Sequence, residues 1–232
     1  MIVRSKSIAS LFVFGFTVFF CFMQGAYALE CEKHKPKTYL LPEIKPVEYI
    51  RNISSDELSS MHLGGSTSHT SRVLGLAGGP LGTKFSVDFE AVEVAKKLYC
   101  LRAKKIKAYF FAKPKIYIAS NFKRGSCEYN KVLKHETEHV TILKRAHKEY
   151  TPKYRHHLRK LSYNIPTLSP TKLIDVNKQK DLLVAELNKE MSAYLSVITK
   201  DISKRQAVID TPEEYARVYS KCKRWEKKLR DD

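Results

Sequence analysis

The sequence predicts an α+β fold in which a small, mainly antiparallel sheet is followed by a helical region. Alternation of apolar and polar residues, which is typical of strands, is confined to residues 83–120. Amphipathic segments with helical periodicity, bounded by capping residues and prolines, fill residues 126–229. Because the strands precede the helices instead of alternating with them, the pattern favours an α+β fold over a parallel α/β fold.

The first 28 residues are expected to be a signal peptide. Arg4 and Lys6 precede an apolar stretch, and Ala26-Tyr27-Ala28 matches a small-residue cleavage signal. A second apolar run long enough to cross a bilayer is absent from the sequence, so no stable membrane span is expected after signal removal. We therefore expect an exported protein that is periplasmic or extracellular.

Cysteine content and charge constrain the partners of the mature chain. Its four cysteines are Cys31, Cys100, Cys127 and Cys222. An even number in an exported chain predicts two disulfide bonds, with three pairings left open. The net charge, +18 for the full sequence and +16 without Arg4 and Lys6, indicates either attraction to an anionic envelope surface or a solubilising charge spread over the fold. The basic residues form no nucleic-acid-binding signature, so no nucleic acid partner is expected.

The mature chain is expected to form one domain preceded by an N-terminal arm. The arm covers residues 29–82, is anchored by Cys31 and ends in a Gly-rich loop over residues 64–82. In the domain, residues 83–232, strands are expected at Lys84–Val94, 99–111 and Lys115–Ser120. Lysines on a strand suit the edge of a sheet, and we assign that edge to Lys115–Ser120.

Four helices are predicted in the remainder of the domain. Ser126 is a good N-cap for the first, and Thr151-Pro152 is expected to end it. Thr211-Pro212-Glu213-Glu214 predicts the start of the last helix, with Thr211 as N-cap. The four helices are expected at Glu128–Tyr150, Pro152–Tyr163, Leu173–Ser203 and Pro212–Leu229.

The first of these helices carries the pentapeptide His-Glu-Thr-Glu-His at residues 135–139. Residues four apart lie on one side of a helix, so His135 and His139 can present their imidazoles to a single metal ion. Glu136 can reach a metal-bound water without taking a coordination position. Two imidazoles that hold Zn²⁺ and a carboxylate that accepts the water's proton form a zinc-peptidase arrangement. A solvated helix that carries His and Glu by chance is the alternative.

Apolar residues on the same side of this helix favour the metal-binding interpretation over the solvated one. A solvated helix would keep its histidines opposite its apolar stripe, whereas here they lie on it or beside it, where an unpaired polar group is costly. The apolar residues concerned are Val132, Leu133, Val140, Leu143 and Ala146.

A catalytic zinc ion also needs a third protein ligand. Glu190 is the first choice, because it lies on the apolar face of the segment 173–203, where a carboxylate requires a cation. Glu186, at the margin of that face, is the alternative or the partner of a ligating histidine. Asp210 is a weaker candidate. For Glu190 and Glu186 a salt bridge to a lysine is the competing explanation.

Several features from residue 99 to residue 225 occur together in one known family. They are Cys100, the strand Lys115–Ser120, the turn Gly125-Ser126-Cys127, the helix around the pentapeptide and a late Ile-Asp pair. In these features the chain resembles a family of predicted secreted bacterial zinc-dependent proteases and, more broadly, the zincin metallopeptidases. The resemblance implies metal binding by His135 and His139, a general-base role for Glu136 and a zincin-like domain.

The expected function is that of an exported zinc metallopeptidase acting on a peptide or protein substrate. Hydroxide held by Zn²⁺ attacks the peptide carbonyl, and Glu136 transfers the proton to the leaving amine. The substrate is expected to pair with the edge strand Lys115–Ser120. The candidates for the oxyanion donor are Tyr150, Tyr163, Tyr194 and His147, and His147 is otherwise expected to be a surface residue or an outer partner of the site. The alternatives are a non-catalytic zinc-containing binding module of the envelope and a zinc amidase acting on cell-wall peptides.

Overall fold

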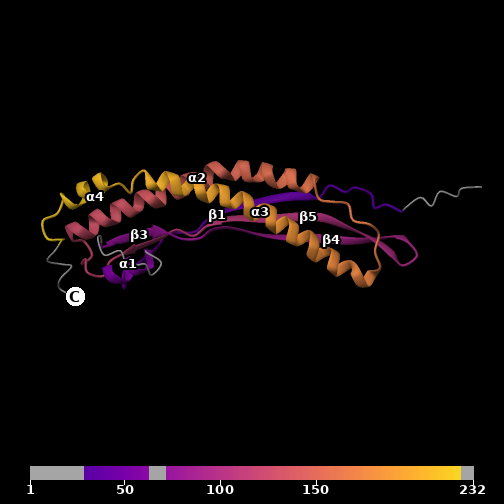
Figure 1. Ribbon diagram of the computed structural model, residues 1–232, viewed down its shortest axis with the longest axis horizontal. Coiled ribbons are helices and arrows are strands. Elements are labelled where there is room, and N and C mark those ends of the chain that lie inside the picture. Colours follow the sequence, from indigo (N-terminus) through magenta and orange to yellow (C-terminus); the bar gives the residue numbers. More distant parts are fainter. Residues whose placement is uncertain (1–28, 63–71, 226–232) are drawn as a thin grey trace, which may run out of the picture.

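The structure, a computed structural model, describes residues 29–62 and 72–225. These residues form six strands, four α-helices and one 3₁₀ turn, which confirms the predicted α+β class. Figure 1 shows an elongated molecule in which two long helices lie along the strands. The expected signal peptide and residues 63–71 of the Gly-rich segment lie outside the described residues. Within the described part, no helix is both long and apolar enough to cross a membrane.

The larger sheet has the strand order β1-β5-β4. Its strands are β1 (Lys37–Ile44), β4 (Leu81–Ala95) and β5 (Leu98–Ala112). β4 and β5 form a long antiparallel hairpin, whose turn places Lys97 at a φ of 62°. β1 pairs with β5 in parallel and buries Leu40. The segment expected to be an extended arm therefore supplies a strand to the sheet and a side chain to its core.

The smaller sheet has the order β2-β6-β3, so the prediction of an edge strand at Lys115–Ser120 is wrong. Its strands are β2 (Glu48–Ile50), β3 (Gly75–Gly78) and β6 (Lys115–Ile118). β6 is central, parallel to β2 and antiparallel to β3. Its lysine, Lys115, forms an ion pair with Glu48 of β2 instead of protecting a free edge. The Gly-rich segment expected to be a loop provides β3.

The pentapeptide lies on α2 (Cys127–Tyr163), a single long helix. Ser126 is its N-cap, as predicted, and its hydroxyl accepts a hydrogen bond from a backbone N–H of the first turn. The predicted break before Pro152 is wrong, because the helix continues through this residue. Proline removes one helical hydrogen bond, but Tyr154 and Leu158 beyond it are buried in the core and hold the helix in place.

The remaining helices include one that was not predicted, within the segment expected to be an extended arm. They are α1 (Ser55–His62), the 3₁₀ turn Leu173–Asp175, α3 (Val176–Ala207) and α4 (Pro212–Tyr219). α4 starts at its predicted cap, Thr211, but it ends well before Leu229. The chain turns back after Tyr219, because the Trp225 indole donates to the Tyr219 carbonyl and its ring packs edge-on against Phe122.

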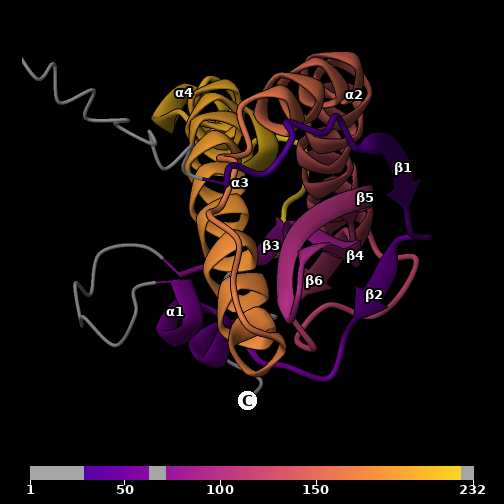
Figure 2. The same ribbon diagram turned by 90° about the vertical axis from the view of Figure 1, so that its right-hand side faces the viewer.

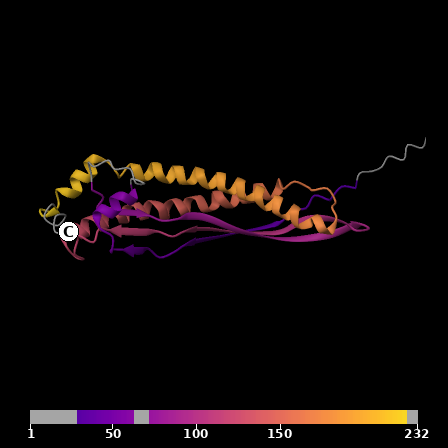
Figure 3. The same cartoon turned by 60° about the horizontal axis from the view of Figure 1, so that its bottom comes forward.

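Two hydrophobic cores divide α2 into two halves. The N-terminal half packs on the smaller sheet, and the C-terminal half packs with α3 on one face of the larger sheet (Figure 2). Figure 3 shows α4 beyond the end of α3, at the end of the molecule that holds the N-terminal half of α2. The first core includes Ile116, Ile118, Val132, Val140 and Trp225, and the second includes Ile106, Phe110, Leu143, Tyr154 and Ile198.

Both predicted disulfide bonds are present. Cys31–Cys100 joins the segment before β1 to β5, and Cys127–Cys222 joins the first residue of α2 to the chain after α4. Disulfides persist in oxidising compartments, so the two bonds are compatible with an exported protein. The second bond also ties the segment that carries α4 to the start of the pentapeptide helix.

Candidate metal centre

The pentapeptide places two buried imidazoles side by side on α2. His135 and His139 are 6% and 7% exposed, and their ring centroids are 4.9 Å apart with the rings nearly perpendicular. Their Nε2 atoms are 3.3 Å apart. Both rings are buried, so neither histidine belongs to a solvated helix face.

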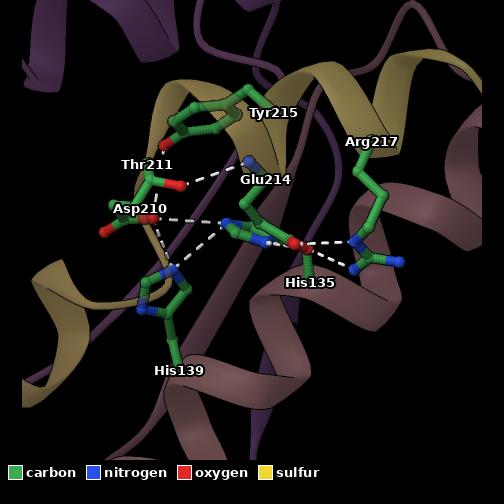
Figure 4. A network of polar contacts seen from close by, with 7 residues as sticks. All are labelled: His135, His139, Asp210, Thr211, Glu214, Tyr215 and Arg217. Atoms are coloured by element: carbon green, nitrogen blue, oxygen red, sulfur yellow. Dashed lines mark hydrogen bonds and ion pairs between the residues drawn. The ribbon is translucent and has the colours of Figure 1, made fainter.

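Asp210 completes the group from a distant part of the chain. Its Oδ1 atom is 3.3 Å from Nε2 of His135 and 2.9 Å from Nε2 of His139 (Figure 4). The residue directly precedes Thr211, the N-cap of α4, whose hydroxyl accepts from the Glu214 N–H at 3.2 Å. The cap fixes the start of α4, and with it the position of the Asp210 carboxylate.

Two of the three separations between the ligand atoms match the spacing of a tetrahedral zinc site, and the third is shorter. Zinc bonds of about 2.0–2.1 Å at the tetrahedral angle separate the ligand atoms by roughly 3.3 Å. The observed separations are 3.3, 3.3 and 2.9 Å, and all three atoms lie within 4.8 Å of one another. The same group can instead be joined by hydrogen bonds in which an imidazole N–H donates to Asp210. The cluster is therefore able to hold a metal ion without being diagnostic of one.

Glu136 lies beside the group without belonging to it. The side chain is 5% exposed and faces β3, where a Cβ added to Gly75 would lie 2.8 Å from its Oε1. Glycine is thus required at position 75 for the strand to approach this carboxylate. Burial, and then the negative charge of Asp210, raise the pKa of Glu136 to about 8. The three ligand atoms come from other residues, so Glu136 stays outside the candidate ligand group, and its role as proton acceptor stays a prediction.

Burial also favours the form of histidine that binds metals. It lowers the pKa of His139, an effect that the nearby Asp210 carboxylate partly opposes. A neutral imidazole has a free lone pair for a metal ion, whereas an imidazolium has none. At neutral pH His139 is therefore in the ligating form.

The structure does not bring Glu190 to the histidine pair. Glu190 lies against His157 instead. Burial lowers the pKa of His157, and the negative charge of Glu190 opposes this shift. His157 is 18 residues beyond His139 on the same helix, which is about 27 Å by helical rise. The alternative, Glu186, forms an exposed pair with Lys189. Asp210, the weakest of the three candidates from the sequence, is the carboxylate that lies at the pair.

The antiparallel packing of α2 and α3 explains this outcome. Glu190 lies opposite His157, and Arg205 forms an ion pair with Glu149. Moving toward the C-terminus of α3 therefore means moving toward the N-terminus of α2. If the same alignment is extended along α2 to His139, the residues opposite lie beyond the end of α3, in the segment around Asp210. An amphipathic sequence pattern does not reveal how two helices are aligned along each other.

The four predicted oxyanion donors also lie away from the pair. Tyr163 is exposed, and the other three side chains interact with groups other than the histidine pair. His147, expected at the surface or as an outer partner of the site, is buried and bonded to a backbone carbonyl of β5. The contacts are Tyr150 with Asp201, Tyr194 with His157, and His147 with the Phe110 carbonyl.

Three α4 residues at the centre were not predicted as site residues. Tyr215 donates to Oδ1 of Asp210 at 3.2 Å, and burial and Asp210 raise its pKa to about 12. Glu214 and Arg217 form an ion pair at the edge of the centre (Figure 4). The predicted cap at Thr211 placed Glu214 in the first turn of a helix, but nothing in the sequence related that turn to His135.

Comparison of the chain with protein-family models, curated proteins and solved structures finds no match. The resemblance to predicted secreted zinc-dependent proteases therefore stays a prediction from the residues.

Proposed function

We propose that the protein is an exported zinc-dependent metallopeptidase. His135, His139 and Asp210 are the zinc ligands in this proposal, and Glu136 is the general base. The observation that supports it is the convergence of Asp210 on the two histidines of the pentapeptide from 71 residues away in sequence, at the ligand spacing of zinc. Three protein ligands leave the fourth coordination position for a water molecule.

The chemistry follows from the positions of these residues. Bound zinc would supply a Lewis acid and lower the pKa of water toward neutrality. Its positive charge would also lower the raised pKa of Glu136, and the ionised carboxylate would then accept a proton from the water and pass it to the leaving amine. Asp210 is 37% exposed, whereas Glu136 is enclosed below Gly75, so substrate enters from the Asp210 side.

The proposed substrate position is the free edge of β3, not β6 as the sequence suggested. β6 pairs with one edge of β3, and no described strand pairs with its other edge. Gly75 brings this strand into contact with Glu136. An extended peptide added to that edge would run past the proposed metal and base, with its backbone held by strand pairing.

The experiment is a peptide-library digest by the mature chain, residues 29–232, after zinc-replete expression. We expect about one zinc ion per chain and cleavage that a chelator abolishes and added zinc restores. Glu136→Gln should keep the zinc and lose about 10²–10⁴-fold in hydrolysis, the usual contribution of a general base. Absence of metal from the wild-type protein would exclude the proposal.

A non-catalytic zinc module is the second candidate, and the enclosure of Glu136 favours it. A carboxylate covered by β3 has little access to a water on the metal. In this case the wild-type protein binds zinc, and neither the peptide library nor cell-wall peptides are cleaved. Cleavage of the cell-wall peptides alone would identify a zinc amidase with the same ligands.

A further inference from the structure

One nitrogen of the proposed zinc ligand His135 is buried without a hydrogen-bond partner. Its Nε2 faces His139 and Asp210, but its Nδ1 contacts no donor or acceptor among the described residues. A neutral imidazole that binds a metal through Nε2 carries its proton on Nδ1. This N–H then needs an acceptor, because leaving a buried donor unsatisfied costs about 1–3 kcal/mol.

Glu214 offers the nearest carboxylate. Its Oε1 atom is 3.9 Å from Nδ1 of His135, which is beyond hydrogen-bond distance, and its side chain is only 20% exposed. Both carboxylate oxygens are held by Arg217, with Oε2 accepting from Nε at 2.7 Å and Oε1 accepting from Nη2. His135 and Arg217 thus face the same oxygen atom (Figure 4).

We propose that Glu214 positions His135 by accepting its Nδ1 proton when a metal binds, and that Arg217 competes with His135 for this acceptor. The inference rests on the proposed metal centre. The segment that begins α4 would then hold His135 from both sides of its ring, with Asp210, just before the cap, at Nε2 and Glu214, in the first turn, toward Nδ1. Such a partner fixes the tautomer and orientation of the ring and makes it a better ligand.

Competition for one oxygen predicts opposite effects of two substitutions. Removing Glu214 deletes the acceptor, and loss of an outer partner of this kind weakens metal affinity by about 10–100-fold. Removing Arg217 frees Oε1 for His135, so metal affinity should stay constant or increase. If Glu214 acts only through its ion pair with Arg217, both substitutions remove that pair and should weaken binding equally.

The test is a zinc titration of the mature chain against a chromophoric chelator, with zinc alone as the ligand. Glu214→Ala should weaken zinc binding about 10–100-fold, Glu214→Gln should weaken it less because an amide oxygen still accepts, and Arg217→Ala should not weaken it. The matched control is Glu149→Ala, which breaks a comparable pair with Arg205 between α2 and α3 and should leave zinc affinity unchanged.

A second readout separates positioning from a structural role. In the zinc-loaded protein, the Nδ1 proton of His135 should give a slowly exchanging proton NMR signal in the wild type and in Arg217→Ala, and this signal should disappear in Glu214→Ala. Unchanged affinity in Glu214→Ala, or equal losses in Glu214→Ala and Arg217→Ala, would overturn the inference alone. A wild-type chain that binds no zinc would overturn the metal centre as well.

Discussion

The two halves of α2 carry buried histidines in opposite circumstances. In the C-terminal half, the His147 Nε2–H donates to the Phe110 carbonyl at 3.0 Å, and its ring stacks on the Phe110 ring at 4.3 Å. In the N-terminal half, the Nε2 atoms of His135 and His139 point at each other and at one carboxylate oxygen. A buried histidine with its own partner is structural, whereas two that converge on a carboxylate can form a metal site.

The largest difference between the halves should appear when histidines are removed. The double substitution of His135 and His139 by Ala should abolish zinc binding, because it deletes two of three proposed ligands. His147→Ala should keep the zinc and lower the free energy of unfolding by about 2–4 kcal/mol, through a core cavity and an unsatisfied Phe110 carbonyl. Zinc analysis and denaturant unfolding measure the two effects. Loss of zinc in a folded His147→Ala protein would contradict the comparison.

The next largest effect concerns the carboxylates that lie opposite each half. Asp210→Asn should reduce zinc affinity by more than the roughly 10–100-fold cost of losing an outer partner, because it changes a ligand. Glu190→Gln is the control, since Glu190 faces His157 in the other half and should not affect zinc. Competition with a chelator measures both affinities. If the Glu190 substitution proves the more damaging, the third ligand assigned here is wrong.

The same carboxylates show which parts of the candidate site the sequence alone can predict. The positions of His135, Glu136 and His139 follow from helical periodicity, and the cap at Ser126 defines the helix that carries them. The third ligand depends on which residues of the last helices lie opposite this turn of α2. That register depends on the packing of α3 and on the unbroken passage through Pro152, and neither is contained in a local pattern.

The strands illustrate the same limit. β4 and β5 pair locally as an antiparallel hairpin, and a strand was predicted near the observed position of each, although their pairing was not. β1 instead pairs in parallel with β5, and β2 pairs in parallel with β6, so both partners follow much later in the chain. The pairing with β2 places β6 in the centre of its sheet. Parallel pairing between distant segments leaves no turn signal between them, so the sequence suggested an arm and an edge strand.

The two disulfides should differ in a way that sharpens the comparison. α4 contains no buried residue, and Cys127–Cys222 ties its C-terminal side to the start of α2. Replacing both cysteines of this pair by Ser should weaken zinc binding about tenfold if the docked state of α4 falls to about a tenth of the molecules. The same change at Cys31 and Cys100, far from the centre in the fold, should leave zinc affinity unchanged.

Stability provides the control for the disulfide experiment. Each pair should lose about 2–4 kcal/mol of unfolding free energy on removal, since each closes a long loop. Thermal unfolding and zinc titration of the two double variants therefore separate general destabilisation from loss of the Asp210 position. Equal zinc affinities in the two variants would show that α4 docks without its disulfide.

The smallest effect is expected at Pro152, in the half of α2 away from the candidate metal centre. Pro152 is exposed within a continuous helix and cannot donate the hydrogen bond that helical geometry assigns to its nitrogen. Pro152→Ala restores that donor but adds freedom to the unfolded chain, and we expect a net stabilisation of about 1–2 kcal/mol. Zinc affinity should not change, because buried residues of one core on both sides of Pro152, Ala146 and Tyr154 among them, already hold the helix in place. Thermal unfolding and zinc titration test both statements. A destabilised variant would mean that the proline sets a bend by which α2 follows the larger sheet, and a change in zinc affinity would mean that this bend reaches the metal-binding half.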